Sequence, residues 1–306
     1  MQPFLRSTVL RAAGMPQVAG WFRTSQLAGS MVDLFVAGET IDDALVEAAR
    51  LMRGGMTATL DLLGENVQTE GEARQAVEGY RIALRRLAAA GLEPNISVKL
   101  TMLGLDLGDA LALETTGVIV EAAHAIGGFV RIDMESSAYT ERTLAIAGLL
   151  HERFPDNVGT VIQAALRRSP ADVEWAIARG MRIRLVKGAY AEPAAVALGS
   201  GGAVDEAYVR LMERLLDIGN YPALATHDPA LIRAAQGYTA RMAISPDRYE
   251  FQMLYGVRRQ AQRDLVRDGY RMRVYVPYGS QWYPYFTRRI AERPANALFV
   301  LRQIFD

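Results

Sequence analysis

The sequence contains no cysteine and only three histidines among its 306 residues. The absence of cysteine excludes disulfide bonds, iron–sulfur clusters, thiolate zinc sites and cysteine nucleophiles. Three histidines (His124, His151 and His227) are too few for a histidine-rich metal centre. We therefore expect no bound metal.

The chain also lacks an excess of charge of either sign and a long apolar run. Its 34 basic and 34 acidic residues cancel, so no global charge favours nucleic acid or an anionic membrane. No segment has the roughly 18–20 consecutive apolar residues of a membrane span. The N-terminal segment lacks the sustained apolar region and cleavage site of a secretory signal, and we interpret residues 1–37 as a helical arm.

The remaining sequence, residues 38–306, favours one domain of the α/β class. Short apolar runs alternate with segments of helical period from about residue 57 onward. Eight strands are predicted, at residues 58–62, 96–100, 129–133, 159–163, 182–186, 223–226, 249–252 and 273–276. Strands that alternate with helices predict a parallel sheet, and the number eight favours a closed (β/α)8 barrel. An open doubly wound sheet is the alternative, but no GxGxxG follows the first strand. Thr40 is predicted to cap the helix before that strand.

The C-terminal segment YVPYGSQWYPYFTRRIAERPAN, residues 275–296, is the most informative part of the chain. Trp282, Tyr283 and Pro284 mark the expected start of a short helix, since proline is tolerated in a first helical turn. Tyr285, Arg288, Arg289 and Glu292 then share one helical face. Paired guanidinium groups bind carboxylates in bidentate fashion, so this face suits a small anion. A surface helix with an internal Arg–Glu pair is the alternative.

The same segment resembles the C-terminal signature of the proline dehydrogenases, flavoenzymes that oxidise L-proline to 1-pyrroline-5-carboxylate. Five further blocks resemble that family in the family's order: NISVKLTMLGLDL (95–107), VRIDMES (130–136), RLVKGAYAE (184–192), LATHD (224–228) and YEFQMLYGV (249–257). The resemblance covers roughly residues 34–304. It implies a distorted barrel with its last helix over the mouth, and the length fits the short, monofunctional bacterial enzymes.

Active sites of such barrels lie at the C-terminal ends of the strands. Polar residues that end or follow the predicted strands are therefore candidates: Asp61, Glu65, Lys99, Asp133, Gln163, Arg184, Lys187, Thr226, His227, Gln252 and Tyr275. Any one of them could be an ordinary polar residue at a strand end. In particular, Lys99 and Asp133 could form a structural ion pair between neighbouring strands.

The resemblance assigns catalytic roles to Lys99, Asp133, Tyr275, Arg288 and Arg289. It implies that Lys99 and the paired arginines hold the substrate carboxylate, while Asp133 orients and compensates the lysine. Leu254, Tyr275 and Tyr285 would enclose the pyrrolidine ring. A tyrosine at position 275 is associated with proline as substrate, because its bulk leaves no room for the hydroxyl of hydroxyproline. We also hypothesise that Glu65 pairs with Arg288 when the site closes.

The resemblance further implies that the cofactor is FAD. Arg184 would lie beside the N5 side of the isoalloxazine, Gln163 at its polar edge, and Thr226 with His227 at the dinucleotide. His227 could instead act as a general base. The complete set of predicted cofactor residues is Asp133, Met134, Gln163, Arg184, Lys187, Gly188, Ala189, Thr226, His227 and Glu292. Ala191 departs from bifunctional relatives that carry tryptophan there, so contacts to the adenine are expected to differ.

The expected reaction is hydride transfer from proline C5 to flavin N5, with electrons passed to a membrane quinone. The protein is expected in the cytoplasm with peripheral contact at the inner membrane. Two alternatives remain: a flavin barrel enzyme similar to methylenetetrahydrofolate reductase, and a flavin-binding scaffold without turnover. The sequence leaves open whether FMN replaces part of the FAD, whether the chain forms a homo-oligomer, and which acceptor operates in the cell.

Overall fold

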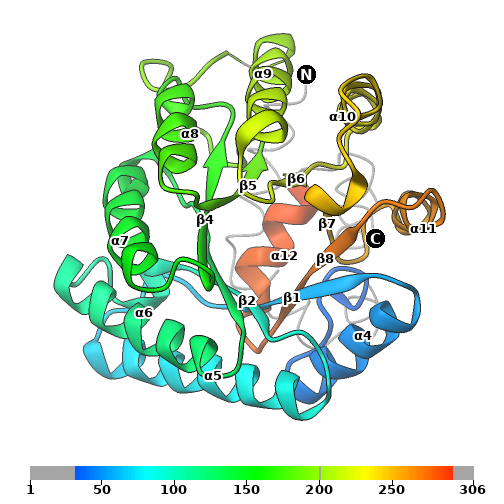
Figure 1. Cartoon of the computed structure of the whole chain (residues 1–306). Helices are drawn as coiled ribbons and strands as arrows, with labels where there is room; N and C mark the ends of the chain where they lie inside the picture. The colour runs from blue at the N-terminus through cyan, green and yellow to red at the C-terminus, as the bar shows by residue number, and fades with distance from the viewer. Residues whose placement is uncertain (1–31, 200, 292–306) are drawn as a thin grey trace, which may run out of the picture.

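A computed structural model describes residues 32–199 and 201–291 as a ring of strands surrounded by helices (Figure 1). Eight parallel strands close into a barrel in chain order. They are β1 (Thr57–Leu62), β2 (Asn95–Val98), β3 (Phe129–Ile132), β4 (Val158–Gln163), β5 (Arg182–Val186), β6 (Ala223–Ala225), β7 (Glu250–Leu254) and β8 (Met272–Tyr278). The predicted (β/α)8 barrel is confirmed, and the open doubly wound sheet is wrong. All eight predicted strands are present, with ends that differ by at most two residues.

Seven helices follow β1 to β7 and cover the outside of the barrel. They are α5 (Glu70–Ala89), α6 (Asp109–His124), α7 (Thr140–Arg153), α8 (Ser169–Ala178), α9 (Gly202–Ile218), α10 (Pro229–Arg241) and α11 (Arg259–Arg267). Three short 3-10 helices lie in the loops: η1 (Leu100–Leu103), η2 (Ser137–Tyr139) and η3 (Pro246–Arg248). None of these helices, nor any other in the described ranges, is long and apolar enough to cross a bilayer.

Two further helices depart from the regular alternation. Helix α4 (Ile41–Arg53) precedes β1 and packs on the outside against β1 and β8. It therefore takes the outer position that the helix after β8 has in a regular barrel. Helix α12 (Trp282–Ala291) follows β8 and is drawn across the middle of the ring in Figure 1. Because it leaves the C-terminal end of β8, it lies at the mouth, as the resemblance implied.

The start of α4 shows the predicted cap. The Thr40 hydroxyl accepts a hydrogen bond from the Asp43 amide, and the Asp43 carboxylate accepts from the Thr40 amide at 3.0 Å. This reciprocal capping box satisfies two N–H groups that the helix leaves unpaired. The predicted N-terminal arm, residues 1–37, lies mostly outside the described residues.

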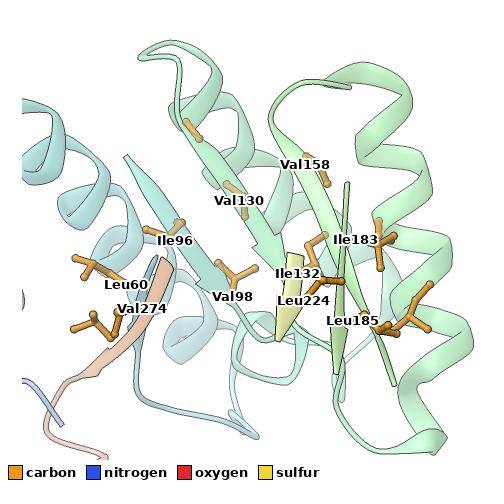
Figure 2. Close-up of a cluster of buried hydrophobic side chains, with 14 of the residues drawn as sticks. Leu60, Ile96, Val98, Val130, Ile132, Val158, Ile183, Leu185, Leu224 and Val274 are labelled. Carbon is orange, nitrogen blue, oxygen red and sulfur yellow. The ribbon is translucent and has the colours of Figure 1, made fainter. Parts of the chain in front are cut away.

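The apolar core lies between the strands and the surrounding helices. Each strand directs every second side chain outward, because side chains alternate along a strand. Figure 2 labels ten of these strand residues: Leu60, Ile96, Val98, Val130, Ile132, Val158, Ile183, Leu185, Leu224 and Val274. They belong to one buried cluster with helix residues such as Leu84, Ile119 and Leu215. Burying each such side chain contributes about 1.5–3 kcal/mol, so this layer carries most of the stability.

The interior of the barrel is polar instead. Arg184 on β5 donates to Ser97 on β2 at 3.1 Å, and β5 and β2 are not neighbours in the closed sheet. The contact therefore crosses the interior. The interiors of such barrels are usually filled with branched apolar side chains. A polar interior needs its charges paired, because an unpaired buried charge is expensive.

The glycine at position 159 on β4 is expected to be essential for packing this interior. A Cβ there would lie 2.6 Å from the Arg131 guanidinium and 2.9 Å from the Phe129 ring. Gly159→Ala is therefore predicted to lower the free energy of unfolding by about 1–3 kcal/mol, the usual cost of overpacking. Urea denaturation followed by circular dichroism measures the change. The control is Gly117→Ala in α6, where the new Cβ meets only Leu150 at 3.7 Å; equal stability of the two variants would contradict the prediction.

Candidate active site

The predicted site residues gather at one end of the barrel. Lys99, Asp133 and Lys187 directly follow β2, β3 and β5, and His227 lies two residues after β6. Because all eight strands are parallel, these positions belong to the same, C-terminal end. The closed barrel thus brings together residues that are far apart in the sequence.

Arg184 is the most highly connected side chain of this end. Its guanidinium donates to the Asp133 carboxylate at 2.7 Å, to the Gln252 side-chain oxygen at 2.5 Å and to the Ser97 hydroxyl at 3.1 Å. It also lies over the Tyr275 ring, 5.2 Å from the centroid. The Arg184 side chain is only 6% exposed. Four groups from four strands or strand ends therefore fix one buried positive charge.

Asp133 also binds the phenol of Tyr275. The Tyr275 hydroxyl donates to the second Asp133 oxygen at 2.8 Å. Burial and the nearby carboxylates of Asp133 and Asp61 raise the pKa of Tyr275 well above its usual value. The phenol therefore stays protonated and acts as a hydrogen-bond donor at neutral pH.

Lys99 pairs with Asp61, and this corrects the predicted direct contact with Asp133. The Lys99 ammonium lies 2.8 Å from Asp61, which is fully buried on β1. Asp61 pairs in register with Ser97, two residues before Lys99, so the lysine side chain reaches back toward it. Burial opposes the charge on Lys99, but the carboxylates of Asp61 and Asp133 outweigh burial and raise its pKa. Asp133 thus acts on Lys99 only through space, because its oxygens bind Arg184 and Tyr275.

Glu135 connects the segments that carry Lys99 and Asp133. Its carboxylate accepts from the Thr101 amide at 3.1 Å and from the Thr101 hydroxyl at 2.6 Å. Its backbone oxygen accepts from the Gln163 side chain at 2.8 Å. Burial raises the pKa of Glu135. The residue belongs to the VRIDMES block, but no role was predicted for it.

Some of the residues predicted to hold FAD have features that suit a phosphate group. Gly188 has φ +115°, and a Cβ there would lie 3.2 Å from the Gln163 side-chain oxygen, so the backbone leaves a cradle that a larger residue would fill. Lys187 lies 2.5 Å from Asp205 and 2.8 Å from Asp228, at the starts of α9 and α10. Helix α9 has no side-chain cap at its N-terminus, so its first N–H groups suit a phosphate.

The other predicted cofactor residues are placed around the same end. His227 Nε2 accepts from the Leu254 amide at 2.9 Å, so in the neutral ring the proton resides on Nδ1. This hydrogen bond uses the lone pair that a general base would need, and it disfavours the base alternative. Thr226 is buried and accepts from the Asp228 amide at 3.1 Å. The Met134 side chain packs in a small apolar cluster, and Ala189 is exposed.

Helix α12 begins at Trp282, as predicted. The Trp282 indole donates to Glu39 at 3.0 Å, and the fully buried Phe286 ring lies 6.4 Å from Phe35. Residues before α4 therefore hold the first turns of α12 in place. Tyr285, also on α12, is buried. The side chains of Arg288 and Arg289 and the whole of Glu292 lie outside the described residues, so their shared face and the hypothesised Glu65–Arg288 pair stay predictions.

The interior residues Arg182, Glu250 and Arg273 were not singled out in the sequence analysis, although the sequence contains a signal for them. Strands of buried parallel sheets usually read as continuous apolar runs. In β5, β7 and β8 polar residues instead recur at every second position: Arg182 and Arg184, Glu250 and Gln252, Arg273 and Tyr275. This period of two indicates that one face of each strand, the inner one, is polar.

Comparison with known proteins identifies the family. The family model described as proline dehydrogenase matches residues 44–302. This chain belongs to the proline dehydrogenase family. Proline dehydrogenase 1 of Bacillus subtilis subsp. natto is 45% identical over 270 residues, which cover 88% of this chain and 89% of the relative. The proline dehydrogenase of Deinococcus radiodurans is 40% identical, covering 97% and 96%. The family and enzyme class predicted from the sequence are confirmed.

Longer members of the family contain a similar barrel. The crystal structure of proline utilization A from Bdellovibrio bacteriovorus, inactivated by N-propargylglycine, superposes with a TM-score of 0.82 at 27% identity. The match covers 87% of this chain but 33% of that one, so this chain spans about a third of the length of that protein. The bifunctional protein PutA of Escherichia coli is 30% identical, with 24% of its length covered.

The buried Lys99–Asp61 pair is predicted to couple the stability of its two members. Asp61→Asn leaves a buried ammonium without its partner and should lower the free energy of unfolding by about 3–5 kcal/mol. Lys99→Met should have a similar cost. The double variant removes both charges, and its cost should fall below the sum of the two by about 0.5–3 kcal/mol.

Urea denaturation of the four proteins measures this cycle. The control is Glu174→Gln, which breaks the exposed Arg214–Glu174 pair at 2.7 Å and should change stability little. Additive costs for Asp61→Asn and Lys99→Met would show that the two side chains do not interact.

Proposed function

We propose that this protein oxidises L-proline to 1-pyrroline-5-carboxylate with FAD as its cofactor. The observation that carries the proposal is the buried Arg184–Asp133–Tyr275 group beside the Lys99–Asp61 pair at the barrel mouth. These residues lie in a chain whose match to proline dehydrogenases extends over residues 44–302.

Charge complementarity accounts for substrate binding. The Lys99 ammonium is held at the mouth by Asp61, and α12 carries Arg288 and Arg289 across that end. Together they supply three cations for one carboxylate, and the paired guanidiniums favour bidentate binding. Clustered positive charges also disfavour a protonated amine nearby. Binding through the carboxylate therefore favours the neutral amine, which is the form that releases hydride.

The chain's own groups would hold and orient the cofactor. Gly188 and the N-terminus of α9 suit the phosphates, and Gln163 suits the polar edge of the ring. Bound FAD would supply the hydride acceptor. Arg184 would provide a fixed positive charge for it, and Tyr275 with Leu254 would border the space for the substrate ring. Positioning then supplies much of the rate.

The remaining partners follow from the family resemblance alone. A membrane quinone is the proposed electron acceptor. The protein would then work from the cytoplasm with peripheral contact at the inner membrane.

An anaerobic absorbance titration of the purified protein is the deciding experiment. L-Proline is expected to bleach the flavin band, while NADH is not. N-Propargylglycine, with which the Bdellovibrio protein was inactivated, is expected to inactivate this one, and L-proline should protect. A colourless protein would overturn the proposal. A flavoprotein bleached by NADH alone would favour the reductase alternative, and one that neither compound bleaches would favour the scaffold.

Tyr275 is predicted to set substrate size through its ring and to fix Asp133 through its hydroxyl. Tyr275→Ser removes both, so hydroxyproline turnover should rise relative to proline turnover. Tyr275→Phe keeps the bulk and removes the hydrogen bond to Asp133, so the ratio of the two substrates should stay that of the wild type. Steady-state kinetics with both substrates measures the ratio. A raised ratio in the phenylalanine variant would refute the steric account.

A further inference from the structure

A continuous chain of polar contacts runs through the barrel interior and ends on Arg184. The Arg273 guanidinium binds Glu93 through two contacts of 3.0 Å and Glu250 through contacts of 2.9 and 3.1 Å. Glu250 in turn accepts from the Gln252 side-chain nitrogen at 2.5 Å. The Gln252 oxygen accepts from Arg184 at 2.5 Å. Donor and acceptor alternate without interruption along these five residues.

This series of polar contacts connects solvent at one end of the barrel with the buried site at the other. The Glu93 side chain lies just before β2 and is 45% exposed, whereas Arg273, Glu250, Gln252 and Arg184 are all buried. In such a low-dielectric interior, hydrogen bonds are stronger and a misplaced donor is costly. The contacts therefore hold each side chain in one orientation.

The side-chain amide of Gln252 has nearly the same shape in two orientations, so its shape alone does not decide between them. A side-chain amide can turn by 180°, which exchanges its oxygen and its NH₂ group. A turned amide would direct its NH₂ group at the Arg184 guanidinium, so that two donors face each other. Glu250 prevents this, because it accepts only from the nitrogen side.

Arg273 keeps Glu250 suited to this task. Burial alone would raise the pKa of Glu250, but the fork of Arg273 outweighs burial and lowers that pKa. Glu250 therefore remains an acceptor throughout the neutral range. Arg273 is itself satisfied by Glu93 and by the Ala58 carbonyl at 2.9 Å.

We propose that Gln252 and Glu250 are positioning residues, which hold the Arg184 guanidinium in the orientation that stabilises the reduced flavin. This inference rests on the proposed function. Neither residue touches substrate or cofactor in it: Gln252 acts through Arg184, and Glu250 acts through the amide of Gln252. Asp133 and Ser97 hold the Nη side of Arg184, and Gln252 alone holds its Nε among the described contacts.

Gln252→Leu tests the proposal, because leucine fills similar space and cannot accept a hydrogen bond. The first measurement is the flavin midpoint potential, by dye-coupled titration without proline. A less firmly held Arg184 should lower the equilibrium constant for reduction about tenfold, which corresponds to about 30 mV for two electrons. Flavin reduction by L-proline should slow about tenfold, while KM should stay within twofold, because Lys99 and α12 are unchanged.

Thr160→Val is the matched control. Thr160 is fully buried on β4 and donates to the Ile132 carbonyl at 2.9 Å, so the variant loses one buried hydrogen bond that does not reach Arg184. Its melting temperature should fall as that of Gln252→Leu does, but its flavin potential should remain that of the wild type. Equal potentials in the two variants would assign Gln252 a merely structural role and overturn the inference.

Glu250→Gln is the second variant and tests the orientation directly, also if Gln252→Leu fails to fold. It keeps the shape at position 250 but no longer offers only acceptors to Gln252. The flavin potential should shift in the same direction by a smaller amount. An unshifted potential would contradict the proposal that Glu250 acts through the amide of Gln252. Failure of the proposed function looks different: a wild-type flavoprotein that L-proline does not bleach refutes that function, and a colourless wild type refutes both.

Discussion

The buried contact between Arg184 and Asp133 is the interaction on which the site depends. Burying a guanidinium with almost no exposure to water is costly, and hydrogen-bond partners at its nitrogens offset that cost. Those partners come from β2, β7 and the loop after β3, and Tyr275 on β8 supplies the ring beneath it. Only a closed barrel brings these elements to within hydrogen-bonding distance of one point, so the fold and the site require each other.

The two faces of the strands differ in chemical character. The outer faces pack against helices in one apolar cluster, while the inner faces carry arginines, carboxylates and amides. Helix α4 takes the outer place beside β1 and β8, which leaves α12 at the barrel mouth. Contacts from Phe35 and Glu39 then hold the first turns of α12. The N-terminal segment thus supports the helix that carries the paired arginines.

Much of the fold was predictable because its signals are local. Short segments of four or five residues, rich in apolar side chains, indicated all eight strands, and Thr40 and Trp282 marked two helix starts correctly. Proximity of Lys99, Asp133, Arg184 and Tyr275 was also predictable, since C-terminal ends of parallel strands meet at one edge. The partner of Lys99 was not: Asp133 was expected, but Asp61 forms the contact. Choosing between two carboxylates depends on register and side-chain reach, which no local pattern encodes.

The sequence by itself determined the elements, their order and the kind of residue at each strand end, because hydrophobic period and capping act within a few neighbouring residues. Its blocks also identified the family. Only the tertiary structure decided which charges pair inside the barrel. Tyr275 and Asp133 are 142 positions apart, and Arg273 reaches the carbonyl of Ala58 across 215. Such contacts are set by strand register and by the width of the interior, and these exist only once the eighth strand has closed on the first.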